Sequence, residues 1–112
     1  MLAAKHRGRV GVGTDPTEAA TGADAVYTDV WTSMGREAEA DERRARFAGF
    51  CVDEALLAHA APHVVALHCM PAHRGEEISA SVLDGPRSLA LEQAENRRYV
   101  QEAVLIELLA RH

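Results

Sequence analysis

Hydrophobic and polar residues follow two kinds of pattern along this chain. Short apolar runs bounded by Gly, Pro or Asp are typical of strands, and such runs occupy residues 9–13, 25–28, 64–67 and 88–91. Stretches with helical spacing and polar start signals lie between and after them, and these predict helices over residues 16–21, 36–47, 53–60, 79–83 and 92–110. Strands that alternate with helices indicate parallel βαβ units. We therefore expect an α/β protein with a three-layer parallel sheet and flanking helices.

The number of strands is small for such a sheet. The chain enters a strand almost at once, with no Gly-rich first turn before it, and doubly wound sheets have more strands than this. We expect an incomplete Rossmann-like domain that corresponds to the later part of a larger α/β unit.

The last predicted helix carries an apolar stripe with an arginine at its start. The stripe consists of Val100, Val104 and Leu108, and it is widened by Ala103, Leu105, Ile106 and Leu109. Arg97 lies one turn before Val100 on the same side. A guanidinium on an apolar face is either paired with a carboxylate or functional, and the pattern leaves both open.

Composition and charge exclude several classes of protein. The 112 residues are 47% hydrophobic, which suits one small globular domain, and the formal net charge of −5 argues against a nucleic-acid surface. There is no apolar run long enough to span a membrane and no apolar segment typical of a secretory signal. Cys51 and Cys69 are expected to be free thiols of a cytoplasmic protein, although a disulfide is an alternative.

Polar residues cluster after two of the predicted strands. One cluster runs from Asp29 to Gly35 and the other from His68 to Arg74. The carboxyl ends of parallel strands share one edge of a sheet, where ligands bind. Asp29 suits an ammonium group, while the Ser33 hydroxyl and the backbone N–H groups of its loop suit a carboxylate. The residues therefore favour a zwitterionic amino acid, and a plain capping turn is the alternative for the first cluster.

Cys69 and the histidines around it admit several interpretations. Cys69 is a buried small side chain, a ligand-contacting thiol or a nucleophile activated by a neighbouring base. The histidines nearby are His59, His63, His68 and His73. They lack the spacing of known zinc sites, so we expect no metal.

Several motifs, taken in order, resemble one enzyme family. They are Tyr27-Thr28-Asp29-Val30-Trp31, Ser33-Met34-Gly35, the run from His68 to Glu77, Asp84-Gly85-Pro86, and Ala94-Glu95-Asn96-Arg97. Their order and spacing closely resemble the C-terminal, ornithine-binding domain of ornithine carbamoyltransferases, from about Gly8 onward. The family's His-Cys-Leu-Pro motif has Met70 in place of Leu, which conserves volume.

The resemblance implies transfer of a carbamoyl group from carbamoyl phosphate to the side-chain amine of ornithine, with citrulline and phosphate as products. By the resemblance, Asp29, Ser33 and Met34 hold ornithine, and the Ser-Met-Gly loop closes over it. No cofactor or metal is implied. The partners implied are the two small-molecule substrates, and the intact family forms homo-oligomers.

The resemblance also assigns the groups that act on the carbamoyl moiety. Cys69 and Met70 contact the carbamoyl group and the substrate amine. Arg97 polarises the carbamoyl carbonyl, and His68 supports the same oxygen. Catalytic roles are thus expected for Cys69, Arg97 and His68, and carbamoyl phosphate contacts for Cys69, Met70 and Arg97.

The family's N-terminal carbamoyl-phosphate motifs, Ser-Thr-Arg-Thr and His-Pro-x-Gln, do not occur in this sequence. We therefore expect residues 1–112 to be a partial ornithine-binding domain without the N-terminal domain, to be inactive alone, and to self-associate or be marginally stable. An N-terminal partner domain would complete it. Two alternatives remain: a non-catalytic module that binds a basic amino acid, and a sister carbamoyltransferase for putrescine or acetylornithine. The Ser33-Met34-Gly35 loop argues for ornithine over putrescine.

Overall fold

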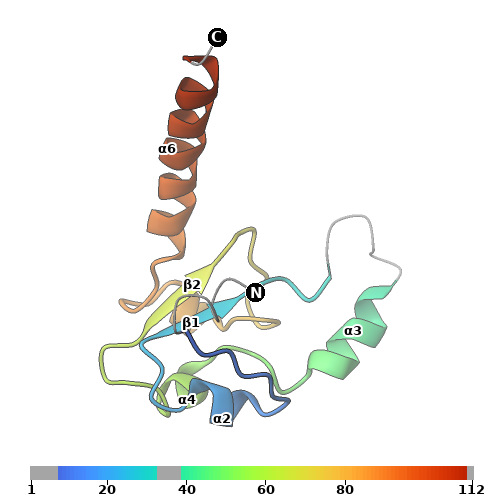
Figure 1. Ribbon diagram of the computed structural model, residues 1–112. Helices are drawn as coiled ribbons and strands as arrows, with labels where there is room; N and C mark the ends of the chain where they lie inside the picture. The colour runs from blue at the N-terminus through green and yellow to red at the C-terminus, as the bar shows by residue number, and fades with distance from the viewer. Residues whose placement is uncertain (1–7, 33–38, 111–112) are drawn as a thin grey trace.

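Two parallel strands and five helices make up the regular structure in the described part of the chain. The computed structural model describes residues 8–32 and 39–110. In order, the elements are α2 (Pro16–Ala20), β1 (Ala25–Thr28), α3 (Ala40–Phe47), α4 (Glu54–Leu57), β2 (Val65–His68), α5 (Ala80–Leu83) and α6 (Ala90–Leu109). The strands pair in parallel, from Ala25 opposite Val65 to Thr28 opposite His68. The α/β prediction is confirmed for this part of the chain (Figure 1).

Two of the four predicted strands are not formed as strands. Residues 9–13 have no regular secondary structure, and Val12 is 98% exposed. A strand needs a hydrogen-bonded neighbour, and this segment has none among residues 8–32 and 39–110. At the other site, Ser88 makes only an isolated bridge to Ala66, because Ala90 already begins α6.

The short helices begin where their polar start signals predict. Asp15 accepts hydrogen bonds from the backbone of Thr17 and Glu18 at the start of α2. Asp53 caps α4 through the Leu56 N–H, and Ser79 caps α5 in the same way. Such caps satisfy backbone donors that the first turn of a helix leaves free. The sequence signals therefore define where these three helices begin.

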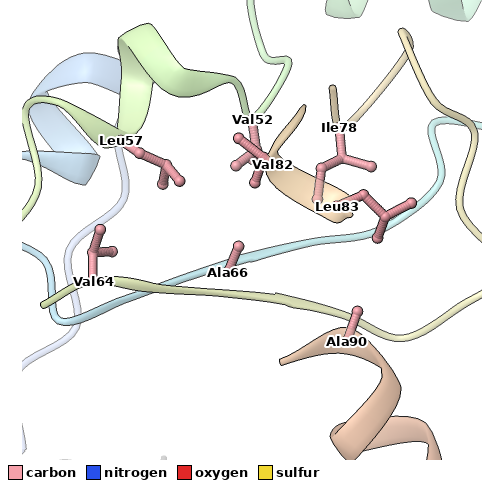
Figure 2. Packing of buried hydrophobic residues seen from close by; sticks show 8 residues of the cluster. All are labelled: Val52, Leu57, Val64, Ala66, Ile78, Val82, Leu83 and Ala90. Carbon is pink, nitrogen blue, oxygen red and sulfur yellow. The ribbon is translucent and has the colours of Figure 1, made fainter. Parts of the chain in front are cut away.

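The core lies on both sides of the strand pair. Figure 2 shows side chains of α4, α5 and the segment before α4 on one side of the strands and Ala90 of α6 on the other. The buried cluster consists of Val52, Leu57, Val64, Ala66, Ile78, Val82, Leu83 and Ala90. Along β2, Ala66 and His68 are buried and alternate with the half-buried Val65 and Leu67. This packing fixes the strand ends that carry the polar residues.

Helix α6 leaves the body of the molecule after its first turns (Figure 1). Its apolar stripe is the one predicted from sequence, yet its side chains are each more than half exposed. They are Val100, Val104, Leu105, Ile106, Leu108 and Leu109. None of the helices described here combines the length and apolar character needed to cross a membrane.

Candidate active site

One residue from each polar cluster, Asp29 and Cys69, meets the other where the strands end, as the sequence predicts. Asp29 follows Thr28 and Cys69 follows His68, and these two strand residues are register partners. The Cys69 thiol donates a hydrogen bond to Asp29 Oδ1 at 2.9 Å. The same oxygen accepts the Val30 N–H at 2.7 Å. A carboxylate and a thiol from segments 40 residues apart therefore form one polar surface.

The Asp29–Cys69 contact sets the charge of this surface. Burial, followed by the hydrogen bond to Asp29, raises the pKa of the Cys69 thiol above its ordinary value. The thiol hydrogen bond is also the main cause that lowers the pKa of the Asp29 carboxyl. At neutral pH the pair is thus a carboxylate beside a neutral thiol. That arrangement suits an ammonium or amine ligand and disfavours Cys69 as a nucleophile, since the thiolate is the reactive form.

Helix α6 is tied to the strand ends by Gln93, a residue that the sequence analysis did not identify. Its Oε1 accepts the His68 N–H at 3.1 Å, and its Nε2 donates to the Tyr27 hydroxyl at 3.2 Å. Arg97 lies one turn further along, on the same face as Gln93, because residues four apart are neighbours on a helix. Its side chain is exposed and makes no ion pair within the described ranges, so the paired alternative is not observed there. The one sequence feature that could have identified Gln93 as a site residue is its position one helical turn before Arg97.

His68 points away from this surface and into the core. It is fully buried and lies on the same side of β2 as Ala66, whereas Cys69 reaches Asp29. Its Nε2 lies 3.0 Å from Glu77 Oε1, and its Nδ1 accepts the Met70 N–H at 2.8 Å. Both ring nitrogens are thus occupied by protein groups. The expected direct action of His68 on a substrate oxygen finds no support in this geometry.

The turn after β2 has an unusual backbone. Met70 has φ of +52°, and the Met70–Pro71 peptide bond is cis. A non-glycine residue in the left-handed region costs about 1–2 kcal/mol. The hydrogen bond from the Met70 N–H to His68 offsets a comparable amount, about 1 kcal/mol. The buried imidazole therefore helps to hold the turn that carries Cys69.

Two hollows flank the strand ends. One, of about 580 Å³, runs along β1 to Asp29 and the aromatic side chains of Trp31 and Phe47, whose rings stack with centroids 6.0 Å apart. The other, also about 580 Å³, is lined by Met70 and by the first turns of α6. The predicted ornithine contacts Ser33 and Met34 lie outside the described residues. Both hollows are wide enough for a small amino acid.

One group of side chains within the described ranges has the composition of a metal site. Ligand atoms of His73, Glu76 and Glu77 lie within 4.8 Å of one another. Glu76 already pairs with Arg44 at 2.9 Å, and Glu77 Oε1 accepts hydrogen bonds from His68 and from the His73 N–H. A cation would compete with these contacts, so we assign no metal there.

The chain matches a known protein family and is similar to individual members of it. The model of the "Aspartate/ornithine carbamoyltransferase, Asp/Orn binding domain" family matches residues 1–108. An ornithine carbamoyltransferase of Sorangium cellulosum (strain So ce56) is 57% identical over 106 residues, which cover 95% of this chain and 34% of that protein.

Solved structures give the same result. The ornithine carbamoyltransferase of Pyrococcus furiosus superposes with a TM-score of 0.85 at 50% identity, over 93% of this chain and 33% of that one. An N-acetyl-L-ornithine transcarbamylase superposes with a TM-score of 0.79 at 33% identity, over 95% and 32%. The chain thus spans about a third of the length of the relatives it matches.

Proposed function

Because this chain belongs to the aspartate/ornithine carbamoyltransferase family, we propose that it forms the amino-acid-binding part of an ornithine carbamoyltransferase. The observation that carries the proposal is the contact between Cys69 and Asp29 at the carboxyl ends of two paired parallel strands. In the reaction, the side-chain amine of ornithine forms a bond to the carbamoyl carbon. The carbon–oxygen bond to phosphate then breaks, and citrulline and phosphate leave.

Asp29 is proposed to bind an ammonium or amine of ornithine, with Ser33 and Met34 holding the amino-acid end. The lowered pKa of Asp29 keeps this carboxylate charged at neutral pH, which favours a cationic ligand. The neutral Cys69 thiol lies against the carboxylate and orients the amine rather than attacking the substrate. The attacking amine must be neutral, so the side-chain ammonium releases one proton to solvent before it attacks. The proton that the nitrogen loses once the carbon–nitrogen bond has formed leaves with the phosphate.

The developing negative oxygen of the tetrahedral intermediate needs cationic or N–H donors. We assign this role to the Arg97 guanidinium, which is exposed on the face of α6 that carries Gln93. The backbone at Met70 and the Cys69 thiol complete the carbamoyl contacts. No metal or cofactor is part of this proposal.

We prefer ornithine over putrescine and acetylornithine as the substrate because of the sequence identity to named relatives. The matched curated relatives named ornithine carbamoyltransferase are 53–60% identical to this chain and the matched solved structures of that name are 35–50% identical, whereas the matched N-acetyl-L-ornithine transcarbamylase is 33% identical.

The remaining parts of the reaction are assigned to regions outside this sequence. Since the Ser-Thr-Arg-Thr and His-Pro-x-Gln motifs are not in these 112 residues, we propose that a carbamoyl-phosphate domain supplies them. The two strands would then form part of a larger three-layer, Rossmann-like sheet. We further propose a cytoplasmic location and homo-oligomerisation, as the family resemblance implies.

A chimera tests this proposal. Residues 8–110 replace the matching third of the Sorangium cellulosum enzyme, and citrulline formation is measured with ornithine, putrescine and N-acetylornithine. We expect activity with ornithine, and a loss of about 10²-fold or more in Asp29→Asn because a positioning charge is removed. Asp24→Asn, the same change at the other end of β1, is the control and should change activity by less than about twofold. An active chimera that prefers putrescine or N-acetylornithine, or is unaffected by Asp29→Asn, would contradict the proposal.

A further inference from the structure

Glu77 is a fully buried carboxylate that the sequence analysis left without a role. Its Oε1 lies 3.0 Å from His68 Nε2 and accepts the His73 N–H at 2.6 Å. These two contacts lie at the two ends of the turn formed by residues 68–73. Glu77 therefore joins both ends of the segment that carries Cys69 and Met70.

The hydrogen bonds define which ring nitrogen of His68 carries the proton. A backbone N–H can only donate, so His68 Nδ1 must accept from Met70 and is unprotonated. The ring proton is then on Nε2 and is donated to Glu77 Oε1. A carboxylate next to one ring nitrogen fixes the tautomer in this way. The result is a continuous chain from Glu77 through the imidazole to the Met70 amide.

We propose that Glu77 is a positioning residue that acts through His68 on the Met70 backbone. It holds His68 in the Nε2–H form, so that Nδ1 accepts the Met70 N–H and keeps Met70 in its left-handed conformation. This fixes the turn from which Cys69 reaches Asp29. The consequence for carbamoyl transfer rests on the proposed function, but the hydrogen-bonded chain does not.

Two substitutions of His68 separate the halves of this chain. In His68→Asn, the side-chain oxygen lies near the former Nδ1 and still accepts the Met70 N–H, while the contact to Glu77 is lost. In His68→Gln, the side-chain amide lies near the former Nε2 and still donates to Glu77, while the acceptor for Met70 is lost. If the hydrogen bond from the Met70 N–H to residue 68 holds the turn, the turn stays ordered in His68→Asn and loses its order in His68→Gln.

Glu77→Met removes the acceptor for Nε2–H and keeps a side chain of similar length. Glu76→Gln is the matched control, because this neighbouring carboxylate pairs with Arg44 and does not touch His68. These four variants distinguish a specific positioning role from a general need for charge near the turn.

The experiment is NMR spectroscopy of the labelled full chain without ligand. We expect ¹⁵N shifts of wild-type His68 that identify the Nε2–H tautomer. We also expect hydrogen exchange at the Met70 amide to be faster by about tenfold in Glu77→Met and His68→Gln, and by less than about threefold in His68→Asn and Glu76→Gln. The Leu57 and Val64 amides report whether each variant is folded.

An Nδ1–H tautomer in the wild type would overturn the proposal even if no variant folds. Unchanged Met70 exchange in folded Glu77→Met, or an equal effect of Glu76→Gln, would overturn it as well. The measurements need neither ornithine nor a second domain. Failure of this proposal is therefore distinguishable from failure of the proposed carbamoyl transfer.

Discussion

The contact between Asp29 and Cys69 makes a quantitative prediction about thiol chemistry. Asp29→Asn removes the carboxylate charge next to the sulfur, and both the hydrogen bond and the charge of Asp29 raise the thiol pKa. The substitution must therefore lower that pKa and increase the fraction of reactive thiolate. We expect Cys69 to react faster with iodoacetamide in this variant.

The expected size follows from the 2.9 Å between Cys69 Sγ and Asp29 Oδ1. Two unit charges at that separation repel by about 1.4 kcal/mol at the dielectric constant of water, the appropriate limit for this exposed surface. That energy corresponds to about a tenfold change in thiolate population. Nucleophilicity falls as the thiol becomes more acidic, with a Brønsted slope of about 0.4–0.5, which leaves a net gain of about three- to fourfold.

The assay measures alkylation by mass spectrometry at pH 7 to 8, in a Cys51→Ser background so that Cys69 is the only thiol. Asp24→Asn is the control, since Asp24 precedes β1 and pairs with His63. Its rate should match that of the parent within about twofold. An unchanged or slower reaction in Asp29→Asn would refute the arrangement of charge described for this site.

Other predictions concern stability and the remaining site residue. Leu57→Ala removes a side chain that is 1% exposed and should lower the free energy of unfolding by about 2–5 kcal/mol in urea titration; an unchanged midpoint would contradict the packing. Gly85→Ala places a Cβ against the Ser81 carbonyl oxygen and should cost about 1–3 kcal/mol, whereas Gly49→Ala, which meets no atom, should cost less. The hydrogen bond to Arg74 lowers the pKa of Asp84 below its ordinary value of 3.8. The contribution of Asp84 to the free energy of unfolding is therefore complete above pH 3.8 and is lost as the pH falls below it. In Asp84→Asn the corresponding decrease of the urea midpoint in acid should disappear. Arg97→Met should leave the melting temperature nearly unchanged but reduce citrulline formation by the chimera about 10²–10³-fold, and full activity would exclude Arg97 from the reaction.

The meeting of Asp29 and Cys69 could be predicted from sequence because it depends only on strand order and direction. Each residue follows an apolar run, and parallel strands bring their carboxyl ends together. The orientation of His68 was also accessible, since adjacent strand residues face opposite sides. The family resemblance favoured a catalytic role for His68, which stays a prediction, and the imidazole is fully buried on the side of β2 that alternation indicates.

Glu77 could not be identified in the same way. It follows Glu76 directly, and the two are chemically identical, yet only Glu77 is fully buried. Their difference arises from the position of the turn relative to His68, which is a property of the folded chain. The failed strand at residues 9–13 has a related cause. Its apolar pattern is compatible with a strand, but strand formation depends on a neighbour that the pattern does not specify.

The Met70 turn, the Asp29–Cys69 pair and Arg97 differ in how firmly the protein holds them in place. The difference follows from how directly each is connected to the core. The Met70 turn is bound to a buried imidazole, and the Asp29–Cys69 pair is fixed by two strands that are hydrogen-bonded to each other. Arg97 is fixed only through the helix that Gln93 ties to the strand ends. A guanidinium held in this way keeps its donors free for an oxygen-rich ligand. The Asp29–Cys69 pair, proposed to orient the amine, is therefore held by contacts within this chain, while the proposed contact of a carbamoyl oxygen with Arg97 depends on how that ligand is delivered.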